Sequence, residues 1–157
     1  MQRYFALCGV MIICLFFSVG SVLAEDYTAS PEDETAIRGT LGAYVSAMET
    51  AEPYKALPYY SDRTYQMMKN RRVSDGVMRK EALDIKACGQ GRLFVYGSLA
   101  VLRFSGEKRQ CAPYFFVFQD DYWRLDLYTM MRVVRFDHKN QWWLDRKIET
   151  PYSFAFE

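Results

Sequence analysis

Residues 115–128, FFVFQDDYWRLDLY, restrict the fold more than any other stretch of this chain. Runs rich in aromatic and aliphatic residues flank the adjacent Asp120 and Asp121. Asp is favoured in tight turns because its short side chain hydrogen-bonds nearby backbone N–H groups. The pattern therefore predicts an antiparallel hairpin, with strands at residues 114–118 and 122–128, and a hairpin turn at the two aspartates.

Alternation assigns the side chains of the second strand to two faces. Trp123, Leu125 and Leu127 share one face, which is the natural core face because it is apolar. The opposite face carries polar and aromatic side chains, namely Tyr122, Arg124, Asp126 and Tyr128. We therefore expect Asp126 to point to solvent or to pair with Arg124 or a neighbouring strand, and not to act as a buried acid or base.

Helical signals precede this hairpin. Ser30 is a typical N-cap, Pro31 suits the first helical position, and acidic residues follow in the first turn. Apolar residues then recur at helical spacing, at Ile37, Leu41, Tyr44, Val45 and Met48. This helix should end before Pro53, because a residue that precedes proline avoids the α region. Shorter helices are expected around residues 53–57 and 61–71.

The other segments are interpreted from turn signals and β-rich composition. We expect irregular structure at 73–81, a short strand at 84–88, a strand at 92–104 with a bulge or bend at Gly97, a turn at 106–109, and a hairpin of residues 131–136 and 141–144. Helices come first and antiparallel strands follow. This order favours an α+β fold with N-terminal helices packed on a curved antiparallel sheet.

A family resemblance agrees with this order. The segment ETAIRGTLGAYVSAMETAEPYKALPYYSDRTYQMM resembles the opening of nuclear transport factor 2-like domains, also called the cystatin-like cone fold. The residues that carry the resemblance are Ala36, Ile37, Tyr44, Ala47, Leu57, Tyr60 and Ser61. The aromatic hairpin with its acidic turn is also similar to that family. The resemblance covers roughly residues 32–145 and implies a cone-shaped fold, but it does not define a function, because the family includes enzymes, adaptors and non-catalytic modules.

The first 24 residues read as a secretory signal peptide. Arg3 precedes an apolar run that extends to about Val19, and Val22-Leu23-Ala24 fits a cleavage site before Glu25. No later apolar run is long enough to anchor the chain in a membrane. The sequence therefore predicts export to the periplasm, without stable membrane insertion after cleavage, and a single domain formed by residues 25–157.

Two cysteines, Cys88 and Cys111, remain after this cleavage. An even number of cysteines in an exported chain favours a disulfide. The expected strands argue against it, because they place Cys111 near a hairpin turn and Cys88 near the far end of the first strand, and bridged Cα atoms lie within roughly 7 Å. The sequence leaves the bond undecided.

Charge and motif content exclude several classes of function. Loss of Arg3 leaves 19 basic residues against 19 acidic ones, so nucleic acid and anionic membranes are not expected as partners. His138 is the single histidine and falls in a turn, which gives no metal-ligand spacing. The chain has neither a P-loop nor a Gly-x-Ser-x-Gly motif. We expect no cofactor and no metal.

Two functions remain open. The first is an exported, non-catalytic domain that binds a protein or a small apolar ligand, for example an immunity protein that neutralises a toxin in the periplasm. The second is implied by the family resemblance: an isomerase or cyclase with a carboxylate, for which Asp126 is the candidate, and tyrosines in the cone cavity. The expected binding residues are Tyr44, Tyr60, Tyr96, Tyr122, Arg124, Tyr128 and Trp142. Whether the protein forms a homodimer also stays open.

Overall fold

The computed structural model describes residues 27–105 and 110–156. The first elements are α1 (Pro31–Glu49), the 3-10 helix η1 (Pro53–Tyr59), α2 (Asp62–Met68) and α3 (Asp75–Cys88). Strands follow: β1 (Arg92–Tyr96), β2 (Leu99–Arg103), β3 (Tyr114–Gln119) and β4 (Tyr122–Leu125). The chain continues with α4 (Leu127–Val133), β5 (Val134–Phe136), β6 (Trp142–Leu144) and the 3-10 helix η2 (Ser153–Phe156). The predicted signal peptide and the predicted turn at 106–109 lie outside the described residues.

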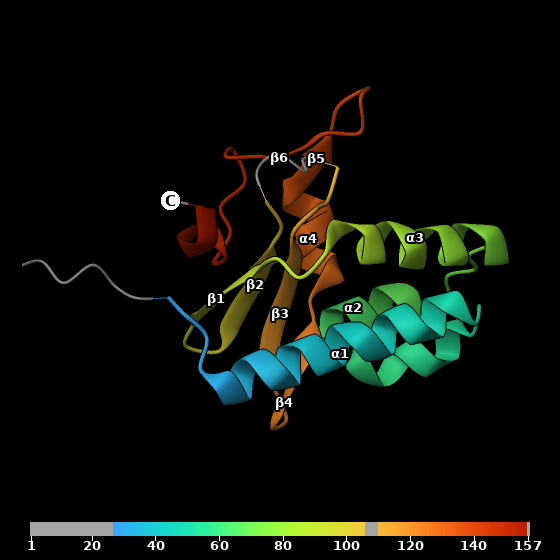
Figure 1. The fold of residues 1–157 in the computed structure, drawn as a ribbon, viewed down its shortest axis with the longest axis horizontal. Helices are drawn as coiled ribbons and strands as arrows, with labels where there is room; N and C mark the ends of the chain where they lie inside the picture. Colours follow the sequence, from blue (N-terminus) through green and yellow to red (C-terminus); the bar gives the residue numbers. More distant parts are fainter. Residues whose placement is uncertain (1–26, 106–109, 157) are drawn as a thin grey trace, which may run out of the picture.

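The α+β class is confirmed. Strands β1 to β4 form one antiparallel sheet in sequence order, and β5 and β6 pair separately. The N-terminal helices lie on one side of the four-stranded sheet, and the C-terminal segment with η2 lies on the other (Figure 1). No helix in the described part of the chain is long and apolar enough to cross a membrane.

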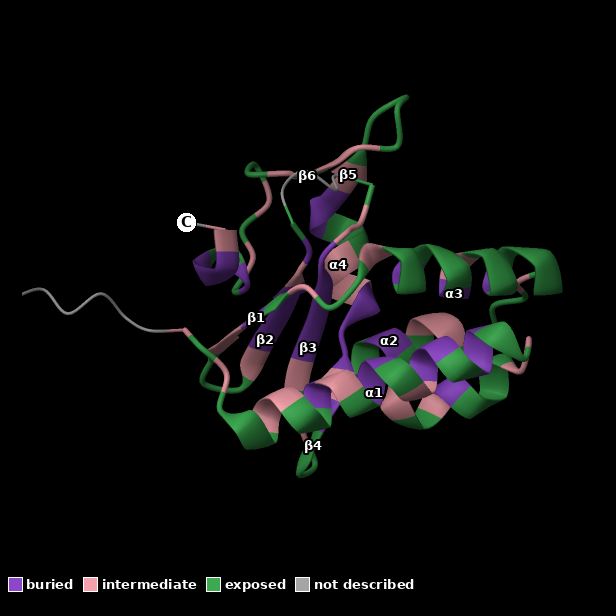
Figure 2. Cartoon of the chain, viewed as in Figure 1, coloured by how far each residue is buried: buried purple, intermediate pink, exposed green. Residues whose placement is uncertain are grey.

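The sheet carries a hydrophobic cluster on each face. On the helix-facing side, Phe116 and Leu125 pack with Tyr44 of α1. On the opposite side, here called the outer face, Phe115 packs against Tyr152 of the C-terminal segment, with ring centroids 4.4 Å apart. Figure 2 shows that β2 and β3 are buried over most of their length, whereas the turn after β3 is exposed. Both faces of the sheet are therefore shielded from water by other segments of the same chain.

Helix α1 begins as predicted and is fixed to the sheet. The Ser30 side chain accepts a hydrogen bond from the backbone N of Asp33 at 3.1 Å, which caps the helix. The indole Nε1 of Trp123 donates to Asp33 Oδ1 at 2.9 Å, and Thr40 donates to the Trp123 carbonyl at 2.8 Å. These two bonds position α1 along β4, so the indole identified in the sequence anchors the helical layer.

The predictions for residues 73–81 and 84–88 are wrong. Residues 75–88 form helix α3, so the irregular structure expected at 73–81 is found only at residues 73 and 74, and the strand expected at 84–88 is absent. Met78, Ala82 and Ile85 recur at helical spacing and are the buried residues of α3, so the helix presents one apolar stripe to α1. The Ser-Asp-Gly turn signal marks only the start of this helix, where Ser74 is the N-cap residue.

The predicted single strand at 92–104 is also wrong, because it is a hairpin. Gly97, with φ +55°, lies in a two-residue turn that separates β1 from β2. Glycine adopts this left-handed conformation without steric penalty, whereas most residues do not. The bend expected at this glycine is a full reversal of the chain.

The hairpin turn at Asp120 and Asp121 is confirmed. Both residues have positive φ, +50° and +64°, as a two-residue type I′ turn requires. The following strand is shorter than predicted, because α4 begins at Leu127, and α4 also includes residues 131–133. The last hairpin forms at β5 and β6, and Asp137 Oδ1 accepts from the backbone of Lys139 and Gln141 within its turn.

Cys88 and Cys111 form a disulfide, with their Cα atoms 5.7 Å apart. The geometric objection from the sequence fails because Cys88 ends helix α3 and does not belong to a strand. The bond joins α3 to the segment that enters β3.

Candidate functional site

The expected binding residues do not form a single site. Tyr44 and Tyr60 lie together among the helices, with ring centroids 6.0 Å apart. Three others, Tyr96, Tyr122 and Arg124, lie on the outer face of the sheet. The remaining two, Tyr128 and Trp142, belong to neither group: Tyr128 is in α4 beside Arg132, and Trp142 packs against Phe156.

A small cavity lies between the helices. Its volume is about 150 Å³. Its walls come from α1, η1, the end of α2, the segment that follows α2, and α3; they include Tyr44, Met48, Pro53, Tyr54, Leu57, Tyr60, Met68, Lys69, Arg71, Val73, Met78 and Glu81. Most of this lining is apolar or aromatic, so its few polar groups determine what can bind there.

The Tyr44 hydroxyl donates a hydrogen bond to Glu81 Oε1 at 2.6 Å. This bond joins α1 to α3 across the cavity wall. Burial, and then the nearby Glu81 carboxylate, raises the pKa of Tyr44 well above its usual value. Tyr44 therefore stays protonated at neutral pH and acts as a fixed hydrogen-bond donor.

Tyr60 is 3% exposed, and burial followed by the charge of Glu81 raises its pKa above the usual value. Its hydroxyl has no hydrogen-bond partner among the described residues, whereas every fully buried side-chain polar atom of those residues has one. The Tyr60 oxygen must therefore reach open space, and the open space beside it is the cavity. A hydroxyl that opens into a cavity and has no protein partner is available to a ligand.

Glu81 was missed by the sequence-based interpretation, because residues 73–81 were taken as irregular. Two signals in the sequence would have found it: a Ser-Asp helix start at Ser74 and the helical spacing of Met78, Ala82 and Ile85. Glu81 then falls on the flank of the apolar stripe, where a carboxylate can reach a partner at the edge of the core.

The predicted environment of Asp126 is wrong. The residue is 8% exposed and does not point to solvent. Its Oδ1 accepts from the Thr129 backbone N at 3.1 Å and caps α4, and its Oδ2 accepts from the Tyr152 hydroxyl at 2.9 Å. Alternation placed Asp126 opposite the helical layer, but the C-terminal segment covers that face here. Both carboxylate oxygens therefore accept hydrogen bonds that stabilise the fold.

Replacement of Asp126 by Ala should lower the free energy of unfolding by about 2–3 kcal/mol, because a helix cap is lost and the buried Tyr152 hydroxyl loses its acceptor. Urea denaturation followed by circular dichroism measures this change. Glu149→Ala, which removes an exposed carboxylate from the same C-terminal segment, is the matched control and should change stability by less than about 0.5 kcal/mol. Equal losses in the two variants would contradict a structural role for Asp126.

The outer face keeps two exposed tyrosines, Tyr96 and Tyr122, beside the part that the C-terminal segment covers. The pairing register aligns Tyr96, Leu99, Val117 and Arg124 across the four strands. Tyr96 is 51% exposed, and Tyr122, on the same face of β4, is 68% exposed. The Arg124 guanidinium lies 5.9 Å from the Tyr122 ring centroid and donates to the Pro58 carbonyl at 2.6 Å. Tyr96 and Tyr122 are therefore the large aromatic side chains of the outer face that are accessible to a protein partner.

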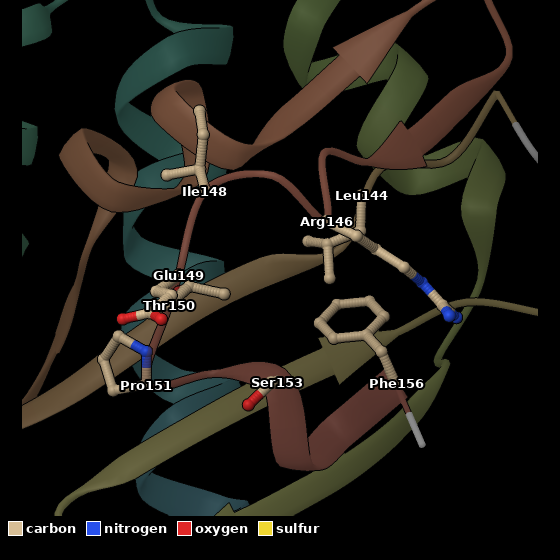
Figure 3. Close-up of a pocket in the computed structure, with 8 residues that line it drawn as sticks. All are labelled: Leu144, Arg146, Ile148, Glu149, Thr150, Pro151, Ser153 and Phe156. Atoms are coloured by element: carbon tan, nitrogen blue, oxygen red, sulfur yellow. The ribbon is translucent and has the colours of Figure 1, made fainter.

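A larger and more open hollow of about 740 Å³ lies beside η2 (Figure 3). Its lining comes from the end of β6, the segment that follows it and η2, and consists of Leu144, Arg146, Ile148, Glu149, Thr150, Pro151, Ser153 and Phe156. In Figure 3 the Arg146 side chain extends away from Glu149, so the charged groups of this hollow do not converge. Shallow walls and divergent polar groups make it a weaker candidate than the helical cavity.

His138 lies in the exposed turn between β5 and β6, as the sequence predicted. Among residues 27–105 and 110–156, no group of three or more His, Cys, Asp or Glu side chains could hold a metal ion.

The chain has no significant match to a protein-family model, a curated protein or a solved structure. Its class is therefore defined by its own architecture: an α+β domain in which N-terminal helices pack against a four-stranded antiparallel sheet.

Proposed function

We propose that this protein is a non-catalytic binding domain that holds a small, mainly apolar molecule in the cavity between α1, η1 and α3. The observation that carries the proposal is the Tyr60 hydroxyl, which opens into the cavity from a largely buried ring and has no hydrogen-bond partner among the described residues. Because this oxygen reaches open space, it carries no penalty for an unpaired buried group, and a hydrogen bond from it to a ligand contributes about 0.5–1.5 kcal/mol.

Cavity volume limits the size of the ligand. A cavity of about 150 Å³ accommodates a molecule close to benzene in size, and it lies below the range of about 300–1,000 Å³ that is usual for larger metabolites. A phenol-sized molecule fits this volume, and a polycyclic one does not.

The lining also selects the chemistry of the ligand. Glu81 directs Oε1 to Tyr44, and its other oxygen remains an acceptor for a ligand O–H or N–H. Lys69 and Arg71 also line the cavity and disfavour a cationic ligand. The favoured ligand is therefore a neutral molecule with a single hydrogen-bond donor that also accepts from Tyr60.

We also keep two predictions made from the sequence as proposals. The order of a long first helix, short helices and an antiparallel sheet with an aspartate turn supports membership of the nuclear transport factor 2-like domains, with a curved, cone-shaped sheet. The leading segment supports export to the periplasm. An immunity protein would contact its toxin through the exposed Tyr96 and Tyr122 of the outer face, and this partner stays a prediction.

Titration of the purified protein with phenol, followed by calorimetry and by melting temperature, tests the ligand site. Tyr60→Phe should weaken phenol binding about fivefold to tenfold, because it removes one hydrogen bond. It should leave toluene binding unchanged, since toluene has no polar group. Val73→Trp, which fills the cavity from its wall, should abolish binding of both probes.

The matched control is Tyr65→Phe, which removes a hydroxyl from a half-exposed α2 tyrosine outside the cavity lining. It should bind phenol like the unmodified protein. Phenol binding that survives Val73→Trp, or that falls equally in Tyr60→Phe and Tyr65→Phe, would exclude this cavity as the site.

One observation favours an enzyme as the second candidate. Glu81 and Tyr60 supply a carboxylate and a protonated phenol at one cavity, which are the groups that an isomerase uses as base and oxyanion donor. The two functions differ in the charge of the preferred ligand. Lys69 and Arg71 attract a phenolate in either case, so the probes are compared in a Lys69→Gln/Arg71→Gln variant. There a binding site that uses Glu81 as acceptor favours neutral phenol, whereas an oxyanion site favours an ionised nitrophenol. Tighter binding of the ionised probe would therefore replace the binding proposal with the enzyme.

A further inference from the structure

Two arginines lie directly opposite each other on the outer face of the sheet. Arg92 of β1 pairs with Arg103 of β2 in the antiparallel register. Like charges at directly opposite positions of an antiparallel pair destabilise the sheet. Strands normally avoid this arrangement or place a carboxylate beside it.

Both guanidinium groups lie against a single aromatic ring. The Cζ atoms of Arg92 and Arg103 are 4.8 Å and 5.4 Å from the ring centroid of Phe94. Arg103 is fixed further, because it donates to the Ala155 carbonyl and lies 5.2 Å from the ring of Phe156. The pair is therefore positioned by the fold before any ligand arrives.

No carboxylate of residues 27–105 or 110–156 forms an ion pair with Arg92 or Arg103. Other arginines of the protein do have such partners, for example Arg38 with Glu34 at 2.8 Å. Burial, and then the charge of Arg92, lowers the pKa of Arg103. The local field is positive and uncompensated within the described chain.

The pair borders a hollow of about 590 Å³, whose lining also includes Gly91, Phe104 and Ser105. Guanidinium groups present planar forks of N–H donors that match the oxygens of phosphate. An anion with two negative charges compensates both arginines, which a single carboxylate does not. We propose that Arg92 and Arg103 form a binding site for a phosphate group, either free phosphate or the phosphate of a small molecule, separate from the cavity at Tyr60.

Isothermal titration of the purified protein with inorganic phosphate, at constant ionic strength adjusted with chloride, tests this site. Arg92 is exposed, so Arg92→Gln should leave the fold intact and weaken phosphate binding at least tenfold. Arg92→Lys keeps the charge but loses the planar fork. Its affinity for phosphate should therefore lie between those of the unmodified protein and of Arg92→Gln. Arg63→Gln removes the same charge from the exposed face of α2 and is the matched control.

A second arm identifies the source of the phosphate group. Phenyl phosphate that binds more than tenfold tighter than inorganic phosphate indicates a phosphorylated small molecule, whereas equal affinities indicate free phosphate. The proposal is overturned if no phosphate binding is measurable, if Arg92→Gln binds phosphate like the unmodified protein, or if Arg63→Gln weakens binding as much as Arg92→Gln does.

Discussion

Alkaline solution is expected to unfold this protein cooperatively between about pH 11 and 13. Four tyrosines that are largely buried have pKa values raised above the usual value of 10.0: Tyr44, Tyr60, Tyr114 and Tyr152. Burial is the largest cause in each case. Nearby carboxylates add to it, Glu81 at the first three tyrosines and Asp126 at Tyr152. The four phenols therefore stay protonated in the folded state at a pH that ionises them in the unfolded chain.

The sign of the effect follows from proton linkage. Below pH 10 both states carry the four protons, and the contribution of these groups to stability is fully present. Above pH 10 the unfolded chain releases protons that the folded chain retains, so stability falls as pH rises. Each such group contributes about 1.4 kcal/mol per pH unit, and four together about 5.6 kcal/mol per pH unit. A free energy of unfolding of about 5–15 kcal/mol therefore falls to zero within about one to three pH units above pH 10.

Circular dichroism and tyrosinate absorbance, recorded on the same samples, measure this transition. Ionisation of the four buried tyrosines should coincide with loss of the helical signal. Tyr60→Phe removes one of the four titrating groups without removing a hydrogen bond inside the protein, so it should reduce the slope of stability against pH by about one quarter. Gradual ionisation of all tyrosines in a protein that stays folded would refute the linkage.

Local signals in the sequence predicted α1 and the β3–β4 hairpin correctly. The Ser30 cap and the turn at Asp120 and Asp121 depend on hydrogen bonds within a few residues, which a sequence pattern contains in full. Helix α3 was missed because a strong turn signal at its start outweighed a short apolar stripe. The stripe is short because only one face of α3 packs against the rest of the protein.

The environment of Asp126 could not be inferred from alternation alone. The period of two assigns it to the outer face, but it does not indicate whether another segment covers that face. The cover comes from Tyr152 and Phe154, which are distant in sequence and belong to a segment with little regular structure. The cavity has the same limitation, because Tyr44, Tyr60 and Glu81 meet only through the packing of α3 on α1.

Removal of the Cys88–Cys111 disulfide is expected to lower the free energy of unfolding by about 3 kcal/mol. The bond closes a loop with a sequence separation of 23 residues, and a cross-link of that span restricts the unfolded chain by about this amount. The double variant Cys88→Ser/Cys111→Ser should therefore unfold at a lower urea concentration than the oxidised protein. The reduced, unsubstituted protein is the matched control and should unfold with the double variant, because both lack the cross-link but keep similar side chains.

The consequence extends from stability to the ligand site. Cys88 ends the helix that carries Glu81, and the helix is otherwise held mainly by a narrow apolar stripe against α1. Without the disulfide the end of α3 loses its cross-link to the segment that enters β3, so phenol binding at the cavity should weaken together with stability. If the double variant loses stability but binds phenol like the oxidised protein, the packing of α3 on α1 suffices to hold Glu81 in place. If neither changes, the cross-link has no energetic role in this fold.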